Sequence, residues 1–222
     1  MPPYAIDVIE ARVGRSAQVS LYTDHILPHL LNLSMRKGDL MPYRKRVVSR
    51  AEGRVLEIGI GSGLNLPLYG STVEEILGLE PAPGMMSMAQ RAAARSGQAV
   101  TLIAGSAEAI PLEAHSVDTI LTTWTLCSIP RAGDALKEMR RVLRPNGQLL
   151  FVEHGLAPEA NVQRWQDRLT PFWRRIGGGC HLNRPIRTLI ENAGFSIAEL
   201  TTGYMRGLKP MTYMYEGRAT PG

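Results

Sequence analysis

The 222-residue chain has few cysteines and no apolar run long enough to cross a bilayer, which needs about 20 such residues. Its two cysteines, Cys127 and Cys180, lie far apart and form no Cys-X-X-Cys pair. The sequence therefore predicts free thiols, no disulfide scaffold and no metal site. The N-terminus also lacks the basic-then-apolar order of a secretory signal, so we expect a cytoplasmic protein.

The composition is that of a folded domain, with 44% hydrophobic and 20% charged residues. The net charge of +5 is unevenly distributed. Residues 1–50 hold 8 basic and 4 acidic side chains, residues 51–160 hold 8 and 12, and residues 161–222 hold 9 and 4. Basic flanks around an acidic centre do not form the concentrated basic face of a nucleic-acid binder, so no nucleic-acid partner is predicted.

Short runs rich in β-branched residues alternate with stretches of helical spacing along the middle of the chain. Helices are expected at 85–95 and 132–143, and strands at 54–60, 75–79, 99–104, 117–122 and 148–153. The segment 64–69 is expected to open a further helix, and the stretch 144–147, with Pro145 and Asn146-Gly147, is expected to form a turn. Such alternation predicts βαβ units, with ligands at the carboxyl ends of the strands. Runs at 195–200 and 211–216 predict a closing antiparallel pair. We therefore expect an α/β, Rossmann-like sheet of seven strands, mainly parallel with an antiparallel C-terminal strand, and helices on both faces.

The first 50 residues have a different character. A leucine-rich helical stripe over 21–33 is interrupted by Pro28 and followed by a basic cluster at 36–46. This pattern predicts an N-terminal helical extension or lid over 1–50, in front of a domain over 51–222. A peripheral contact with a membrane surface is the alternative for the same segment. His25 and His29 lie four residues apart, but no further ligand pattern accompanies them.

Three glycines with alternate spacing, Gly59, Gly61 and Gly63, follow the first predicted strand, and Glu57 precedes them. Glycine lets the backbone turn tightly and approach a ligand closely. A dinucleotide site would have its third glycine at position 64, which is leucine. The loop therefore favours a ligand without pyrophosphate.

Acidic and small residues follow the next strands at matching places. Glu80 ends the second strand, where a carboxylate can accept hydrogen bonds from both ribose hydroxyls. Ser106, Ala107 and Glu108 follow the third strand, in a loop placed to flank an adenine, and Thr123 ends the fourth. These residues are the predicted cofactor contacts, together with Glu57 and the three glycines.

This order of motifs resembles the class I S-adenosylmethionine-dependent methyltransferases over about residues 50–155. The glycine loop, Glu80, the 107–111 segment, the 116–118 strand entry and the 141–147 segment carry the resemblance. It implies S-adenosylmethionine as the cofactor and an enzyme that transfers a methyl group. Ser106 stands where many relatives have an aspartate that binds the adenine amine, which leaves a backbone contact there.

The distal half is similar to the methyltransferase-like thiol S-methyltransferases, small membrane-associated enzymes with lipophilic acceptors. The similarity lies in the 125–129 segment, Glu153-His154 and the 179–184 segment. It implies a small lipophilic acceptor with a thiol favoured. A thiol must lose its proton to become nucleophilic, and His154, at the end of the fifth strand, is the predicted base. A purely structural histidine is the alternative.

Three other functions remain open at this point. The first is a phospholipid or quinone methyltransferase at a membrane surface, and the second is a protein that binds S-adenosylmethionine without turnover. Protein acceptors are the third. A nucleic-acid methyltransferase is disfavoured because the residues after the fourth strand lack the Pro-Pro-aromatic motif that holds a flipped base.

Overall fold

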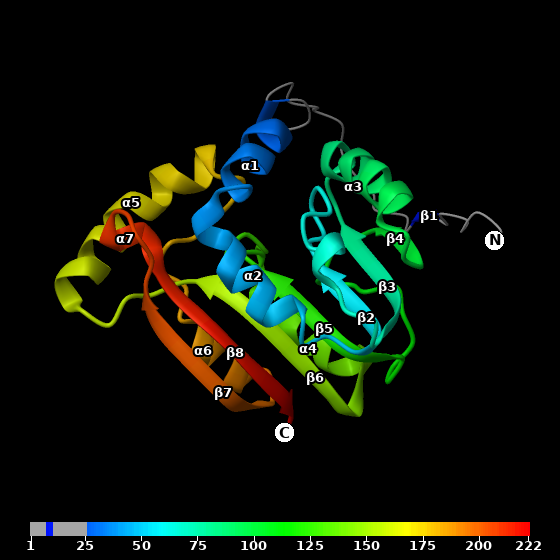
Figure 1. Cartoon of the computed structure of the whole chain (residues 1–222). Coiled ribbons are helices and arrows are strands. Elements are labelled where there is room, and N and C mark those ends of the chain that lie inside the picture. The colour runs from blue at the N-terminus through cyan, green and yellow to red at the C-terminus, as the bar shows by residue number, and fades with distance from the viewer. Residues whose placement is uncertain (1–7, 11–25) are drawn as a thin grey trace.

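The centre of the molecule is one twisted sheet in the computed structural model, which describes residues 8–10 and 26–222 (Figure 1). The strand order is β1-β4-β3-β2-β5-β6-β8-β7. β8 runs antiparallel to both of its neighbours, and the remaining neighbours pair in parallel. The strands are β1 (Val8–Glu10), β2 (Gly53–Ile58), β3 (Val73–Glu80), β4 (Val100–Ala104), β5 (Val117–Thr123), β6 (Leu143–His154), β7 (Phe195–Tyr204) and β8 (Tyr213–Pro221).

The predicted mainly parallel sheet with an antiparallel C-terminal strand is confirmed, with one addition. The short strand β1 pairs with β4 and extends the sheet to eight strands. The closing pair, β7 and β8, is antiparallel as predicted, and its register runs from Phe195 opposite Pro221 to Tyr204 opposite Tyr213. No described helix is long and apolar enough to span a membrane.

Helices cover both faces of the sheet, as predicted (Figure 1). One apolar layer joins the sheet to α4 and α6 through Leu136, Met139 and Ile186, and the other joins it to α2 and α3 through Val48 and Met86. Each such side chain stabilises the fold by about 1.5–3 kcal/mol when fully buried. The helices are α1 (Leu27–Met35), α2 (Met41–Val48), α3 (Pro83–Ser96), α4 (Ala132–Val142), α5 (Ala160–Ile176), α6 (Ile186–Asn192) and α7 (Lys209–Thr212).

Two local predictions need correction. The segment 64–69 was expected to open a helix, but it forms only a 3₁₀ turn over Leu66–Leu68, because Pro67 and the following Gly70 prevent a longer helix. The turn expected at 144–147 lies within β6. There the pairing with β5 steps from Leu143 directly to Gln148, so the intervening residues form an irregularity in the strand.

The N-terminal segment is not helical throughout, since Val8–Glu10 forms β1, and helices occur from Leu27 onward. α1 lies beside the carboxyl ends of the central strands, and α2 runs from there across one face of the sheet (Figure 1). The first part of the predicted leucine stripe, including Leu21, and His25 lie outside the described residues. β1, α1 and α2 are therefore the parts of the predicted extension over 1–50 whose relation to the sheet can be stated.

Candidate active site

A cavity of about 370 Å³ opens at the carboxyl ends of β2, β3, β4 and β5. The chain leaves β2 toward β3 on one side and continues through β5 on the other, which is the switch point where α/β sheets bind ligands. The volume is within the range of about 300–1,000 Å³ that is usual for small-molecule sites. Of the predicted cofactor contacts, those that line it are Glu57, Gly59, Gly61, Glu80, Ser106, Ala107 and Thr123.

The glycine loop bends through left-handed backbone conformations at all three predicted positions, with φ of 68° at Gly59, 58° at Gly61 and 77° at Gly63. Among the described residues, no atom would lie closer than 3.9 Å to a Cβ on Gly61, so this glycine leaves open space toward the cavity. A Cβ on Gly63 would lie 2.7 Å from the Cβ of Ala92 in α3. Gly63 does not line the cavity and instead allows the loop to pack against α3.

Glu80 fixes the loop from the end of β3. Its Oε2 accepts a hydrogen bond from the Gly61 backbone N–H (3.0 Å), and its Oε1 accepts one from the Ala82 N–H (2.9 Å). Burial raises the pKa of this carboxyl, while the two backbone donors lower it. Each oxygen retains acceptor capacity toward the cavity, which is the capacity that a pair of ribose hydroxyls needs.

Glu57 belongs to a buried network that sequence reasoning did not find. The Asn65 side-chain amide donates to Oε1 (2.6 Å), and the Tyr69 hydroxyl donates to Oε2 (2.7 Å). Asn65 in turn accepts a hydrogen bond from the Arg44 guanidinium (2.6 Å), which lies 4.9 Å from the centre of the Trp124 ring. No spacing in the sequence indicates these partners, because α2 brings Arg44 to the site through tertiary packing.

The burial of Glu57 predicts a specific pH dependence of stability. Desolvation raises the pKa of this carboxyl from 4.5 to about 7. Because the folded chain binds the proton more tightly than the unfolded chain, the free energy of unfolding falls as the pH rises from about 4.5 to about 7. Between about pH 5 and pH 7.5 the wild type should lose about 2 kcal/mol relative to Glu57→Gln, measured by urea unfolding of both proteins.

Glu74→Gln is the matched control, since Glu74 is exposed and lies away from the cavity. The difference in unfolding free energy between this variant and the wild type should not change over the same pH range. A pH-independent difference for Glu57→Gln would contradict the buried-carboxyl explanation.

Ser106 and Glu108 interact with each other, and only Ser106 lines the cavity. The Ser106 hydroxyl donates to Glu108 (3.2 Å), and Glu108 accepts the backbone N–H of Arg131 (2.7 Å) at the start of α4. Glu108 does not line the cavity, so its geometry is that of a side chain anchoring α4. Its contact with a cofactor stays a prediction.

α1 forms one wall of the cavity through Leu27, Leu31 and Met35, together with Pro28 and Asn32. The Ser62 hydroxyl of the glycine loop donates to Asn32 Oδ1 (2.8 Å). The loop after α5 adds Gly177 and Gly178 to the same wall, and the loop after β5 adds Thr125, Ser128, Ile129 and Pro130. This side of the cavity is mostly apolar, whereas the side near Glu57 and Glu80 is polar.

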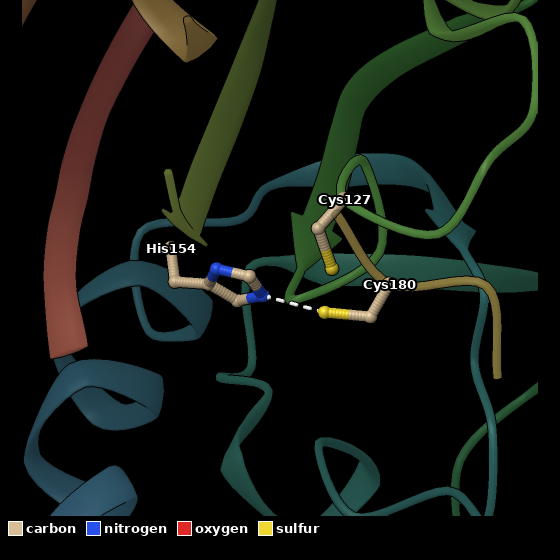
Figure 2. A group of neighbouring side chains, drawn as sticks. All are labelled: Cys127, His154 and Cys180. Carbon is tan, nitrogen blue, oxygen red and sulfur yellow. Dashed lines mark hydrogen bonds between the residues drawn. The ribbon is translucent and has the colours of Figure 1, made fainter. Parts of the chain in front are cut away.

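His154 ends β6, as the sequence predicted, but it does not line the cavity. Its Nε2 lies 3.0 Å from the Cys180 sulfur, and Cys127 lies beside both (Figure 2). The two cysteines are free and buried. A base that acts directly on a bound acceptor would have to face the cavity, so the predicted base role of His154 stays a prediction.

Comparison of the sequence with known proteins identifies the family to which the chain belongs. The model of the family described as "Methyltransferase domain" matches residues 56–151, which span the glycine loop, Glu80 and β5. Thiol S-methyltransferase TMT1B of Rattus norvegicus is 34% identical over 153 residues, or 67% of this chain and 62% of that protein. The chain belongs to the class I S-adenosylmethionine-dependent methyltransferases.

Two further comparisons show how much the family membership says about the acceptor of the methyl group. Phosphatidylethanolamine N-methyltransferase of Cereibacter sphaeroides is 26% identical over 67% of this chain and 74% of that protein. A solved methyltransferase structure from Thermotoga maritima has a TM-score of 0.61 and 23% identity, and the match covers 89% of this chain and 99% of that one. This likeness concerns the fold. Because the chain spans only about three fifths of the thiol S-methyltransferases it matches, their acceptors remain statements about those proteins.

Proposed function

We propose that this protein binds S-adenosylmethionine in the cavity and transfers its methyl group to a small lipophilic acceptor, with a thiol favoured. The observation that carries the proposal is the pairing of Gly61, which leaves open space beside the loop, with Glu80, which lies buried at the edge of that space. A nucleoside seated on the loop would place its ribose against Glu80. Ala107 and the backbone at Ser106 would then flank the adenine.

The polar end of the cavity suits the amino-acid part of the cofactor. Glu57 offers a carboxylate to the ammonium group, and the buried Arg44 offers a guanidinium to the carboxylate. Both side chains are held in place by Asn65, which donates to one and accepts from the other. A carboxyl and a guanidinium group that are held in position before the ligand arrives reduce the cost of orienting it.

The apolar end of the cavity suits a lipophilic acceptor. When bound, the cofactor supplies a methyl group on a positively charged sulfur, so the protein needs chiefly to align an acceptor lone pair with it. Leu31 and Met35 of α1 and Ile129 beyond β5 offer apolar contacts there. α1, part of the extension over 1–50, would exclude water from the bound pair and act as its cover. The similarity to thiol S-methyltransferases supports a thiol acceptor.

The test has a binding stage and a transfer stage. Isothermal titration should give a heat of binding with S-adenosylmethionine and none with NAD. Labelled methyl from the cofactor should then appear on thiols in a panel that also contains phospholipids, quinones and a denatured protein mixture. Binding without transfer to any member would favour a binding protein, and heat with NAD alone would overturn the proposal.

A second candidate, methylation of a lipid at a membrane surface, is favoured by an exposed apolar stripe on α5. Trp165, Leu169, Phe172 and Ile176 follow each other at helical spacing, and Trp165 and Phe172 are 55% and 63% exposed. The same helix has four arginines and one acidic residue. An apolar face with aromatic residues and neighbouring arginines is typical of helices that lie on anionic membranes.

The predicted basic patch at 36–46 contributes less to such a surface than its sequence implied. Arg44 is buried at the cavity, and both guanidinium nitrogens of Arg46 that face Glu216 are paired with its carboxylate at 2.8 and 2.6 Å. α5 is therefore the better candidate for a peripheral contact. The loop that follows it approaches α1, since Gly178 lies near Leu31, so such a contact would adjoin the cavity wall.

Co-sedimentation with vesicles tests the membrane contact. We expect the wild type to pellet with anionic vesicles and the double variant Trp165→Ser, Phe172→Ser to bind roughly tenfold more weakly, because the anchoring rings are lost. Met41→Ser, which removes a partly exposed side chain from α2, should bind like the wild type. A wild type that stays in the supernatant would rule out the membrane form of the function.

A further inference from the structure

The side chains of Cys127, His154 and Cys180 come from three separate segments and meet at one point (Figure 2). Cys127 lies in the loop after β5, His154 ends β6, and Cys180 lies between α5 and α6. Their three potential ligand atoms all lie within 4.8 Å of one another. Two thiols and an imidazole are the donor types that bind zinc most readily in proteins.

We propose that this cluster is a binding site for a thiophilic divalent cation, Zn²⁺, with three protein ligands and one open position. Around a tetrahedral zinc ion, with bonds of about 2.3 Å to sulfur and 2.0–2.1 Å to nitrogen, ligand atoms lie roughly 3.5–3.8 Å apart. The pair His154 Nε2 and Cys180 Sγ, now 3.0 Å apart, would separate by about 0.5 Å, a side-chain adjustment.

The backbone around the cluster is held by hydrogen bonds that do not involve the three ligand side-chain atoms. The buried Gln166 side chain donates to the carbonyls of Gly155 and Leu182, next to His154 and two residues after Cys180. The Cys127 carbonyl accepts the backbone N–H of His181 at 2.9 Å. Such supporting contacts place ligands before an ion binds, which is a requirement of a precise metal site.

The charges near the cluster also suit an ion. Glu153, adjacent to His154, is fully buried, and its Oε2 has no hydrogen-bond partner among the described residues. Arg184 lies close to the cysteines, and its positive charge favours the thiolate forms that bind an ion. Binding Zn²⁺ would break two S–H bonds and release two protons to solvent, so the ion and its two thiolates together add no net charge.

An ion bound at the cluster would lie next to two loops that line the cavity. Ser128, whose hydroxyl lies 3.5 Å from the Cys127 sulfur, lines the cavity, and so does Gly178, two residues before Cys180. An ion would tie together the loops that carry these two residues. The proposal concerns ion binding alone and does not depend on methyl transfer.

Cobalt titration of the full, reduced and chelator-treated chain tests the proposal, because Co²⁺ takes the same ligands as zinc and reports on them by absorption. We expect one Co²⁺ per chain, a thiolate-to-cobalt charge-transfer band, the ligand-field bands of a tetrahedral ion, and displacement by Zn²⁺. Cys127→Ser, Cys180→Ser and His154→Gln should each weaken binding by roughly 100-fold or more.

His29→Gln is the matched control, since His29 is exposed on α1, and its titration should equal that of the wild type. Far-ultraviolet circular dichroism in chelator should be the same for all variants, so that lost binding is not lost fold. A wild type without the charge-transfer band, bands that persist in all three ligand variants, or a Cys127–Cys180 disulfide that forms in place of ion binding would overturn the proposal.

Discussion

Replacing Gly61 by valine is expected to abolish measurable binding of S-adenosylmethionine while the chain remains folded. The substituted side chain would extend from a loop position that faces open space in the cavity, where the ligand is proposed to lie. We expect an affinity loss of more than about 100-fold, which corresponds to about 2.7 kcal/mol, measured by isothermal titration. The left-handed φ of 58° adds a cost of about 1–2 kcal/mol in stability.

Gly97→Val separates the two effects. Gly97 ends α3 with a φ of 71° and does not line the cavity, and no atom of residues 8–10 or 26–222 lies within 4 Å of its Cβ position, apart from its chain neighbours. This variant should lose a similar amount of stability and keep wild-type affinity. Equal affinities for Gly61→Val and Gly97→Val would show that the glycine loop is not the cofactor site.

Glu80→Gln should remove the ability to recognise the ribose hydroxyls. Each Glu80 oxygen accepts one backbone N–H, from Gly61 or from Ala82, and can accept one more hydrogen bond from a ribose hydroxyl. An amide has only one acceptor oxygen, so glutamine cannot keep both backbone bonds and also accept from both hydroxyls. The wild type should bind S-adenosylhomocysteine about 10- to 100-fold more tightly than its 2′-deoxy analogue, as expected for a hydrogen bond to a charged group. The variant should bind the two ligands with nearly equal affinity.

The comparison of two ligands makes this test independent of small losses in stability. Glu74→Gln, on the same strand but exposed, should keep the wild-type preference for the ribose form. If Glu80→Gln discriminates between the two ligands as well as the wild type does, Glu80 only holds the loop and does not contact the ribose.

The parts of the fold that the sequence predicted are those with strong local signals. The β2 run ends in glycine, and the α4 stripe of Leu136 and Met139 repeats at helical spacing, so both elements were found close to their observed bounds. The prediction of a helix at 64–69 was wrong. The apolar residues of this segment fit a helix, but Pro67 and Gly70 allow only one 3₁₀ turn. The short strand β1 was missed because three residues carry too little pattern.

The residues of the candidate site could be predicted from the sequence only where they lie at the carboxyl ends of predicted strands. Glu57 and Glu80 adjoin the ends of β2 and β3, and the carboxyl ends of parallel strands meet at one edge. Arg44 was read as part of a basic surface, since nothing local distinguishes a buried arginine from an exposed one. Cys127 and Cys180 are 53 positions apart in the sequence, so only the fold brings them to His154.

The hydrogen bond from Ser62 to Asn32 bears on how slowly a product would leave the cavity. α1 meets the glycine loop at this bond, so departure past that edge requires breaking it along with the apolar contacts of Leu27 and Leu31. One neutral bond of this kind contributes about 1 kcal/mol, or roughly a fivefold change in a dissociation rate. On the proposed function, the residence time of the demethylated product would then depend on a helix outside the sheet.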